Sequence, residues 1–299
     1  MSKTLVIDFH THIFPAEIAE RAMEKLSRNA HLLPSGEGTE EGLFKAMRGA
    51  GVTHSVVLPV ATSERQVASI NDASAKVKET MEKEGILFFG AIHPLHADFH
   101  AELARIRNLG FRGIKIHPVY QGFDLDAPEF LRILDRAAEL GLIVVTHTGD
   151  DVGLPGVVHV TPGMALRALR EIGASPSRKA SGSFRLVLAH MGGWRRWDEL
   201  DTLGPELAAL APAMIDTSFS TGRFNPLPDG YWDGRSTAML RREEFCSIVR
   251  IFGADRVVFG SDFPWSAQSE VLHFIKESGL SGEETEQILY KNAAELLAL

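Results

Sequence analysis

Short, continuous runs of apolar and β-branched residues alternate along the chain with longer stretches of helical periodicity. In five places a helix-like stretch ends at a glycine and an apolar run follows within a few residues. These glycines are Gly51, Gly85, Gly110, Gly141 and Gly253. Glycine ends helices well because it adopts the left-handed conformation without steric cost. Unbroken apolar strands are typical of parallel sheets buried on both faces, so the pattern predicts a parallel α/β structure.

The apolar runs predict eight strands, near residues 4–10, 54–60, 86–92, 112–117, 142–147, 185–190, 213–218 and 256–261. The stretches between them predict helices near residues 66–84, 98–109, 128–140, 162–172, 239–252 and 267–278, with a last helix over 282–298. Residues of the kind that cap helix N-termini stand at four of these starts. They are Asp98, Asp126, Thr161 and Ser281.

Eight strand–helix units in 299 residues predict a single domain over 1–299 with the (β/α)8 TIM-barrel fold. A doubly wound open sheet is the rival arrangement, but no glycine-rich phosphate loop follows the first strand. Loop insertions are expected after strands 1 and 7, over residues 13–50 and 218–238. Both follow the carboxyl ends of strands, where barrel enzymes carry their substrate loops.

The composition fits a globular enzyme, with 44% hydrophobic and 23% charged residues. A formal net charge of −8 argues against nucleic acid or an anionic membrane as partner, because either would need a basic surface. Cys246 is the single cysteine, so no intrachain disulfide can form, and its apolar surroundings predict a packed core residue. With no apolar leader and no run of about 18 apolar residues, we expect a cytoplasmic protein without a membrane span.

Candidate chemistry begins at the end of the first strand, where His10 and His12 are two residues apart. Residues i and i+2 of a strand point to the same face, so both imidazoles can converge on one point. Three later strands also end in ligand-type residues, His147, His190 and Asp262. A barrel brings the carboxyl ends of all its strands to one rim. The pattern therefore predicts a site for a divalent transition metal such as zinc.

Several motifs together resemble the amidohydrolase superfamily, in the branch that includes aminocarboxymuconate-semialdehyde decarboxylase. They are Asp8-Phe9-His10-Thr11-His12, His147-Thr148-Gly149, Ala189-His190-Met191-Gly192-Gly193, Gly260-Ser261-Asp262-Phe263-Pro264 and Asn292-Ala293-Ala294-Glu295-Leu296-Leu297. The resemblance implies a mononuclear metal site, usually zinc. Its ligands would be His10, His12, His147 and Asp262, with His190 as a catalytic group.

The expected ligand set has a chemical meaning. Three imidazoles and a carboxylate leave a position open for water on a catalytic zinc, and the ion lowers the pKa of that water to about 7. Asp262 can accept the proton of the water and pass it to a leaving group. His190 can donate a hydrogen bond to the water or stabilise an oxyanion.

Further residues near strand ends are candidates for the same cavity. Lys115 ends strand 4, where dinuclear members of the superfamily carry a carboxylated lysine, so carboxylation, a lowered pKa or contact with a substrate carboxylate are open alternatives. His117 and His93 stand at neighbouring strand ends and are candidates for touching metal or substrate. Arginines beyond the strand ends are candidates for binding a substrate carboxylate: Arg195, Arg196 and Arg223. Tryptophans there are candidates for lining an apolar pocket: Trp194, Trp197, Trp232 and Trp265.

Two reactions fit the expected metal site. The first is hydrolysis of a small ester, lactone or amide by a zinc-activated water. The alternative is metal-dependent, non-oxidative decarboxylation of an aromatic or unsaturated acid, which a carboxylate-clamping arginine would favour. A non-catalytic, metal-stabilised scaffold is the third alternative. A structural role of that kind would not explain why the ligand set is open on one side. The expected partners are a small-molecule substrate and a second copy of the chain in a homodimer.

Overall fold

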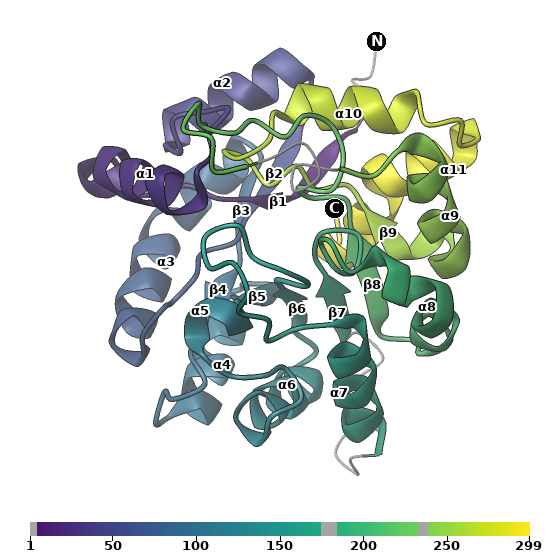
Figure 1. Ribbon diagram of the computed structural model, residues 1–299. Helices are drawn as coiled ribbons and strands as arrows, with labels where there is room; N and C mark the ends of the chain where they lie inside the picture. Colours follow the sequence, from purple (N-terminus) through teal and green to yellow (C-terminus); the bar gives the residue numbers. More distant parts are fainter. Residues whose placement is uncertain (1–4, 175–183, 233–238) are drawn as a thin grey trace. The chain divides into compact units, whose positions relative to one another are not determined.

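The computed structural model of the protein (Figure 1) describes residues 5–174, 184–232 and 239–299. The chain divides into two compact units. Unit 1 comprises Met1–Val57, Asp151–Gly156 and Asp216–Leu299. Unit 2 comprises Leu58–Asp150 and Val157–Ile215. The organisation as one domain over 1–299 stays a prediction.

Parallel strands lie side by side in unit 2 (Figure 1). Their order is β4 (Gly90–Ala91), β5 (Gly113–Ile116), β6 (Ile143–Thr146), β7 (Arg185–Leu188) and β8 (Ala213–Asp216), and a short strand β3 (Ile86–Phe88) precedes β4. The register aligns Ala91, Lys115, Val145, Val187 and Met214 in one row. The strands are short and almost wholly buried, as expected for a parallel sheet covered on both faces.

The helices of unit 2 are α3 (Val67–Lys83), α4 (Phe99–Asn108), α5 (Pro118–Gln121), α6 (Pro128–Leu140), α7 (Pro162–Ala174) and α8 (Leu200–Ala209). Helix α6 shows why such segments become helices. Its buried residues Phe130, Ile133, Leu134 and Ala137 recur at helical spacing, so one face is apolar. Gly141 ends the helix with φ 65°, a left-handed conformation that costs glycine little.

Unit 1 contains the strands β1 (Ile7–Thr11), β2 (His54–Val57) and β9 (Val257–Val258) and the helices α1 (Ala16–Ala30), α2 (Glu40–Ala50), α9 (Arg242–Phe252), α10 (Gln268–Lys276), α11 (Gly282–Glu286) and α12 (Asn292–Leu297). A π-helical turn, Gln287–Lys291, joins the last two helices. β1 and β2 are parallel, with an irregularity between Asp8 and Thr11. Cys246 is buried in α9, as expected of a core residue.

The predicted strands are found at the expected places in the described residues, although the third is interrupted between β3 and β4. No helix was predicted over 13–50, yet α1 and α2 occupy most of that segment. That the segment is an insertion stays a prediction. Helices α5 and α8 were likewise not predicted from the sequence. Of the second expected insertion, residues 233–238 lie outside the described part, and residues 218–232 contain no helix or strand.

The helix caps follow the sequence in part. The hydroxyl groups of Thr161 and Ser281 accept hydrogen bonds from backbone N–H groups of the following turn, at 3.2 Å in both cases. Asp98 stands at the N-cap of α4 without a side-chain cap bond. Asp126 was a wrong prediction: Ala127 is the N-cap of α6, and the Asp126 carboxylate accepts a hydrogen bond from Arg167 instead.

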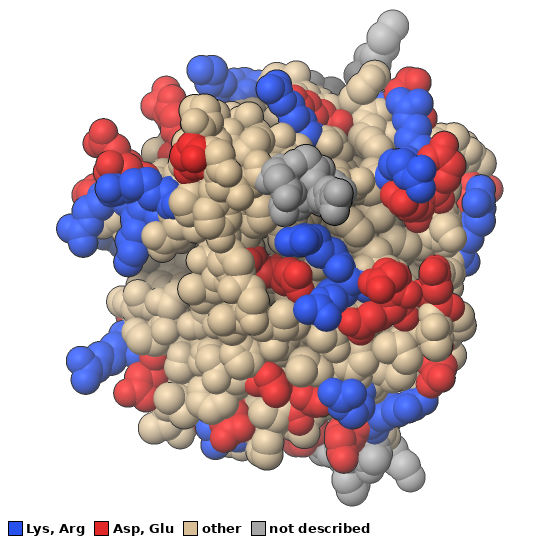
Figure 2. Space-filling model, viewed as in Figure 1, with Lys and Arg blue, Asp and Glu red and all other residues tan. Residues whose placement is uncertain are grey.

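The surface carries both signs of charge. Figure 2 shows Lys and Arg residues interspersed with Asp and Glu residues on the viewed face. In the described part of the chain, none of the helices combines the length and the apolar character needed to cross a bilayer.

A buried amide ties α3 to β4 and α4 in unit 2. The side chain of Asn71 donates to the carbonyl of Ala91 at 2.9 Å and to Glu102 at 2.6 Å, and it accepts from the Ala91 N–H at 2.8 Å. Asn71 is fully buried. Burial alone would raise the pKa of Glu102, but hydrogen bonds from Arg105 and Asn71 hold it below its usual value.

We predict that Asn71→Ala lowers the free energy of unfolding by about 2–5 kcal/mol, because it removes the side-chain hydrogen-bond partner of the buried N–H and of the buried carbonyl group of Ala91. Asn108→Ala, at an exposed position of α4, is the matched control and should change stability by no more than about 0.5 kcal/mol. Urea unfolding of both variants measures the difference. Equal stabilities would show that the Asn71 hydrogen bonds contribute nothing net.

Candidate metal centre

The end of β1 runs beside the segment that carries Asp262. The Asp262 N–H donates to the carbonyl of His10 at 2.9 Å, and the His12 N–H donates to the carbonyl of Phe263 at 2.6 Å. A parallel bridge links Thr11 to Phe263. These backbone bonds set Asp262 against both histidines although the two segments are far apart in sequence.

Three potential ligand atoms converge at this point. His10 Nε2 and His12 Nε2 are 3.2 Å apart, and Asp262 Oδ1 lies 3.4 Å from His10 Nε2 and 3.2 Å from His12 Nε2. Zinc bonds of about 2.0–2.1 Å in tetrahedral geometry separate neighbouring ligand atoms by about 3.3 Å. The triangle therefore fits one divalent ion, and two imidazoles with a carboxylate are a donor set suited to such an ion.

The backbone at Asp262 is in an uncommon conformation. Its φ of 69° lies in the left-handed region, which non-glycine residues seldom adopt. The Asp262 carbonyl accepts from the N–H of Trp265 at 2.8 Å, so a tight turn follows the ligand. Such strain is found where a side chain is held for a function, and here it directs the carboxylate toward the histidines.

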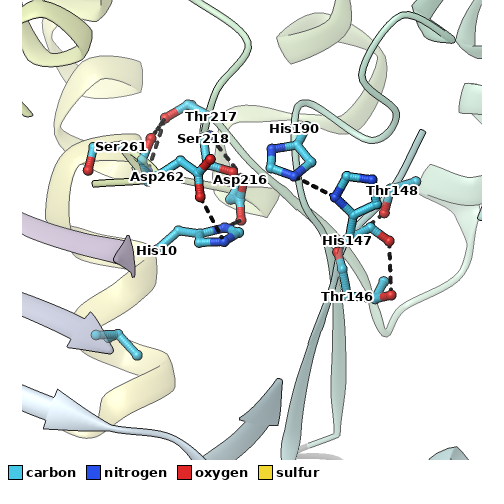
Figure 3. Close-up of polar contacts among 12 residues, drawn as sticks. His10, Thr146, His147, Thr148, His190, Asp216, Thr217, Ser218, Ser261 and Asp262 are labelled. Atoms are coloured by element: carbon cyan, nitrogen blue, oxygen red, sulfur yellow. Dashed lines mark hydrogen bonds and ion pairs between the residues drawn. The ribbon is translucent and has the colours of Figure 1, made fainter. Parts of the chain in front are cut away.

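The opposite side of the His10 ring contacts a second carboxylate. His10 Nδ1 lies 2.7 Å from Asp216 Oδ2, a contact drawn in Figure 3. Asp216 Oδ1 accepts two further hydrogen bonds, from the N–H of Ser218 at 3.0 Å and from its hydroxyl at 2.5 Å. Asp216 and Ser218 are fully buried.

A third buried carboxylate holds the base of β1. Asp8 accepts hydrogen bonds from the hydroxyl of Ser261 at 2.5 Å, from its N–H at 2.9 Å and from Gln268 at 2.8 Å. Burial raises the pKa of Asp8 to about 7, although these hydrogen bonds oppose the shift. Asp8 thereby ties β1 to the residue that precedes Asp262 and to α10.

Unit 2 contains a group of three histidines beyond the ends of β5, β6 and β7. Because the register pairs Lys115 with Val145, the residues two positions on, His117 and His147, lie level with each other. Their rings stack with centroids 4.4 Å apart. His190 Nε2 lies 3.0 Å from His147 Nδ1, as Figure 3 shows, and all three side chains are buried.

Backbone contacts hold the ends of β6 and β7 together. The Trp194 N–H donates to the Thr148 carbonyl at 3.0 Å, and the Trp197 indole donates to the His190 carbonyl at 3.0 Å. A methyl group on Gly149 would lie 2.3 Å from backbone atoms of Trp194, so only glycine permits this approach. The contacts fix the loops from which His147 and His190 project.

A buried glutamine connects three segments of unit 2. Gln121 Oε1 accepts from the N–H of His117 at 2.9 Å, and Gln121 Nε2 donates to the carbonyls of Ala61 and Ile92 at 2.9 and 2.7 Å. Through these hydrogen bonds Gln121 holds the backbone at His117 in place. Sequence reasoning missed it, since a single glutamine in a short helix carries no motif.

The structure thus brings His10, His12 and Asp262 together in unit 1, and His117, His147 and His190 together in unit 2.

Among the other candidates, Lys115 is buried in β5, with 1% of its surface exposed. His93 is buried, and that burial lowers its pKa. Trp194 is buried, Trp265 is half-buried, Arg223 and Arg195 are exposed, and Arg196 forms an ion pair with Asp150 at 2.8 Å. Asp216 and Asp8 were not predicted to have a role.

Residues 7–299 match the model of the amidohydrolase family. The chain therefore belongs to that family, as the motifs predicted. No curated protein matches it in sequence.

Three similar solved structures show the fold. An uncharacterised TIM-barrel protein from Bordetella bronchiseptica shares 17% identity with a TM-score of 0.67, and the match covers 98% of each chain. A probable 2-pyrone-4,6-dicarboxylic acid hydrolase from Acinetobacter baumannii, with citric acid bound, shares 16% identity with a TM-score of 0.61, covering 98% of this chain and 99% of that one. A dihydroxybenzoic acid decarboxylase from a Polaromonas species, with bound manganese and the inhibitor 2-nitroresorcinol, shares 15% identity with a TM-score of 0.66, covering 99% and 97%. The likeness confirms the predicted α/β fold of the TIM-barrel type.

Gly260 offers a test of the ligand triangle. A methyl group there would lie 2.8 Å from the Cβ of His10, closer than such atoms approach, so His10 has to move. We predict that Gly260→Ala weakens zinc binding by about tenfold or more, because ligands must be held within about 0.5 Å of their productive positions.

Gly49→Ala is the matched control, since no atom lies within 4 Å of its added methyl group. It should leave zinc affinity unchanged and stabilise α2 by up to about 1 kcal/mol. Titration calorimetry with zinc measures both variants. Unchanged affinity in Gly260→Ala would show that the position of His10 does not limit metal binding.

Proposed function

We propose that this amidohydrolase family member is a metal-dependent hydrolase of a small ester, lactone or amide. The observation that carries the proposal is the triangle of His10 Nε2, His12 Nε2 and Asp262 Oδ1, with sides of 3.2–3.4 Å. Its donor set leaves coordination positions for other groups, which is typical of catalytic sites and not of structural ones.

The residues then have separate tasks. A divalent ion held there would supply Lewis-acid chemistry, polarising a carbonyl group and lowering the pKa of a water molecule. His10 and His12 hold the ion through Nε2. The carboxylate of Asp262 accepts the proton of the attacking water and returns it to the leaving group.

Two assignments rest on the family resemblance. His147 is proposed as a further ligand, and His190 as the group that stabilises the developing oxyanion through a hydrogen bond. We propose zinc as the ion; manganese, which the Polaromonas decarboxylase binds, is the nearest competitor because oxygen and imidazole donors accept both. A small-molecule substrate and a homodimeric state belong to the same proposal.

Decarboxylation of an aromatic or unsaturated acid is the second candidate. It is supported by the likeness to the Polaromonas decarboxylase and by buried Lys115, a side chain whose ammonium form attracts a carboxylate. Among the described residues, however, none of the arginines is buried, so a buried guanidinium clamp for a substrate carboxylate is lacking there. We therefore place hydrolysis first.

Metal content tests the ligands. We predict that His12→Ala and Asp262→Asn each weaken zinc binding by more than about 100-fold, since each removes a donor from the ion. His147→Ala should do the same if His147 is a ligand. His273→Ala, on an exposed position of α10, is the control and should bind zinc like the unaltered protein. Zinc retained at full affinity in His147→Ala would remove that residue from the ligand set.

A product screen tests the reaction. Metal-loaded protein is incubated with lactones, esters, amides and aromatic acids, and acid release is scored against carbon dioxide release. We predict acid release from at least one lactone, ester or amide, lost in Asp262→Asn. Turnover confined to carbon dioxide evolution would replace the hydrolase with the decarboxylase.

A further inference from the structure

The contact between His10 and Asp216 determines more than the position of a ring. A neutral imidazole carries one proton, on either Nδ1 or Nε2, and only the unprotonated nitrogen can bind a metal. His10 presents Nε2 to the ligand triangle and Nδ1 to Asp216. The position of its single proton therefore decides whether His10 can serve as a ligand.

Asp216 is arranged to accept hydrogen bonds at both oxygens. Its Oδ1 accepts hydrogen bonds from the N–H and the hydroxyl of Ser218. Its Oδ2 is then an acceptor 2.7 Å from His10 Nδ1, which must supply the proton. We propose that Asp216 is a positioning residue that holds His10 as the Nδ1–H tautomer, with Nε2 free of a proton. The consequence for metal affinity rests on the proposed function.

The backbone that carries Asp216 is fixed on its far side. The Thr217 N–H donates to the carbonyl of Val258 at 3.1 Å, and the Thr217 hydroxyl bonds to both the carbonyl and the N–H of Gly260, at 2.9 and 3.0 Å. A methyl group on Gly260 would lie 3.5 Å from the Asp216 carboxyl carbon, so the pair is closely packed. These bonds hold the backbone next to Asp216 in place, and the two hydrogen bonds from Ser218 hold its carboxylate.

Asp216→Asn separates this role from simple space filling, because the two side chains have nearly the same shape. Ser218 offers two donors, so the amide oxygen of the asparagine turns toward it and the NH2 group turns toward His10. An NH2 donor at His10 Nδ1 favours the Nε2–H tautomer, which cannot bind a metal. A structural role alone would leave the tautomer unchanged.

The first measurement needs no metal. Nitrogen-15 NMR of the metal-free, histidine-labelled protein distinguishes the two ring nitrogens of His10, assigned with the variant His10→Gln. We expect Nδ1 to carry the proton in the unaltered protein and Nε2 to carry it in Asp216→Asn. A His10 that carries a proton on Nε2 in the unaltered protein, alone or together with one on Nδ1, overturns the proposal, whether or not the variant folds.

The second measurement is competition with a chelator for zinc. We expect Asp216→Asn to bind zinc about 10–100-fold more weakly, with its melting temperature close to that of the unaltered protein. Asp229→Asn is the matched control: Asp229 accepts from His31 Nδ1 at 2.6 Å in an exposed pair of the same unit, so zinc affinity should not change. Equal zinc affinities in Asp216→Asn and the unaltered protein contradict the proposal. Failure of the unaltered protein to bind zinc, with His10 in the Nδ1–H form, contradicts the proposed function and supports the tautomer assignment.

Discussion

The backbone contact between the end of β1 and the segment at Asp262 is the constraint on which the site in unit 1 depends. It joins parts of the chain about 250 residues apart; Asp8 and Ser261, which bond across it, are separated by 253 positions. Fixing two such segments costs conformational entropy, and buried hydrogen bonds to Asp8 offset part of that cost. Without this contact the Asp262 carboxylate would not lie beside His10 and His12.

The strand ends and the motifs could be predicted because they follow local rules. Short apolar runs marked the strands, and the two-residue spacing of His10 and His12 placed both rings on one side of β1. The motifs pointed to the family that the family model confirms. The parallel register also explains the position of two histidines in unit 2. His117 and His147 lie level because each follows its paired strand residue by two positions.

The rest was beyond a single sequence because it depends on contacts between distant elements. Asp216 ends an ordinary apolar strand, and nothing near it in sequence reveals that its partner is His10. Gln121 bonds to the backbone of three segments, which no local pattern encodes. Helix α2 differs from these cases, because its signal is local: Leu43 and Met47 are four residues apart and Gly51 ends the helix, although a Gly- and Pro-containing stretch near residue 36 precedes it.

The most direct test of the account is a crystal structure of the zinc-loaded protein with anomalous diffraction at the zinc edge. We predict one strong peak within about 2.3 Å of His10 Nε2, His12 Nε2 and Asp262 Oδ1. A zinc peak that touches none of these three atoms, or no peak in protein soaked with excess zinc, would contradict it.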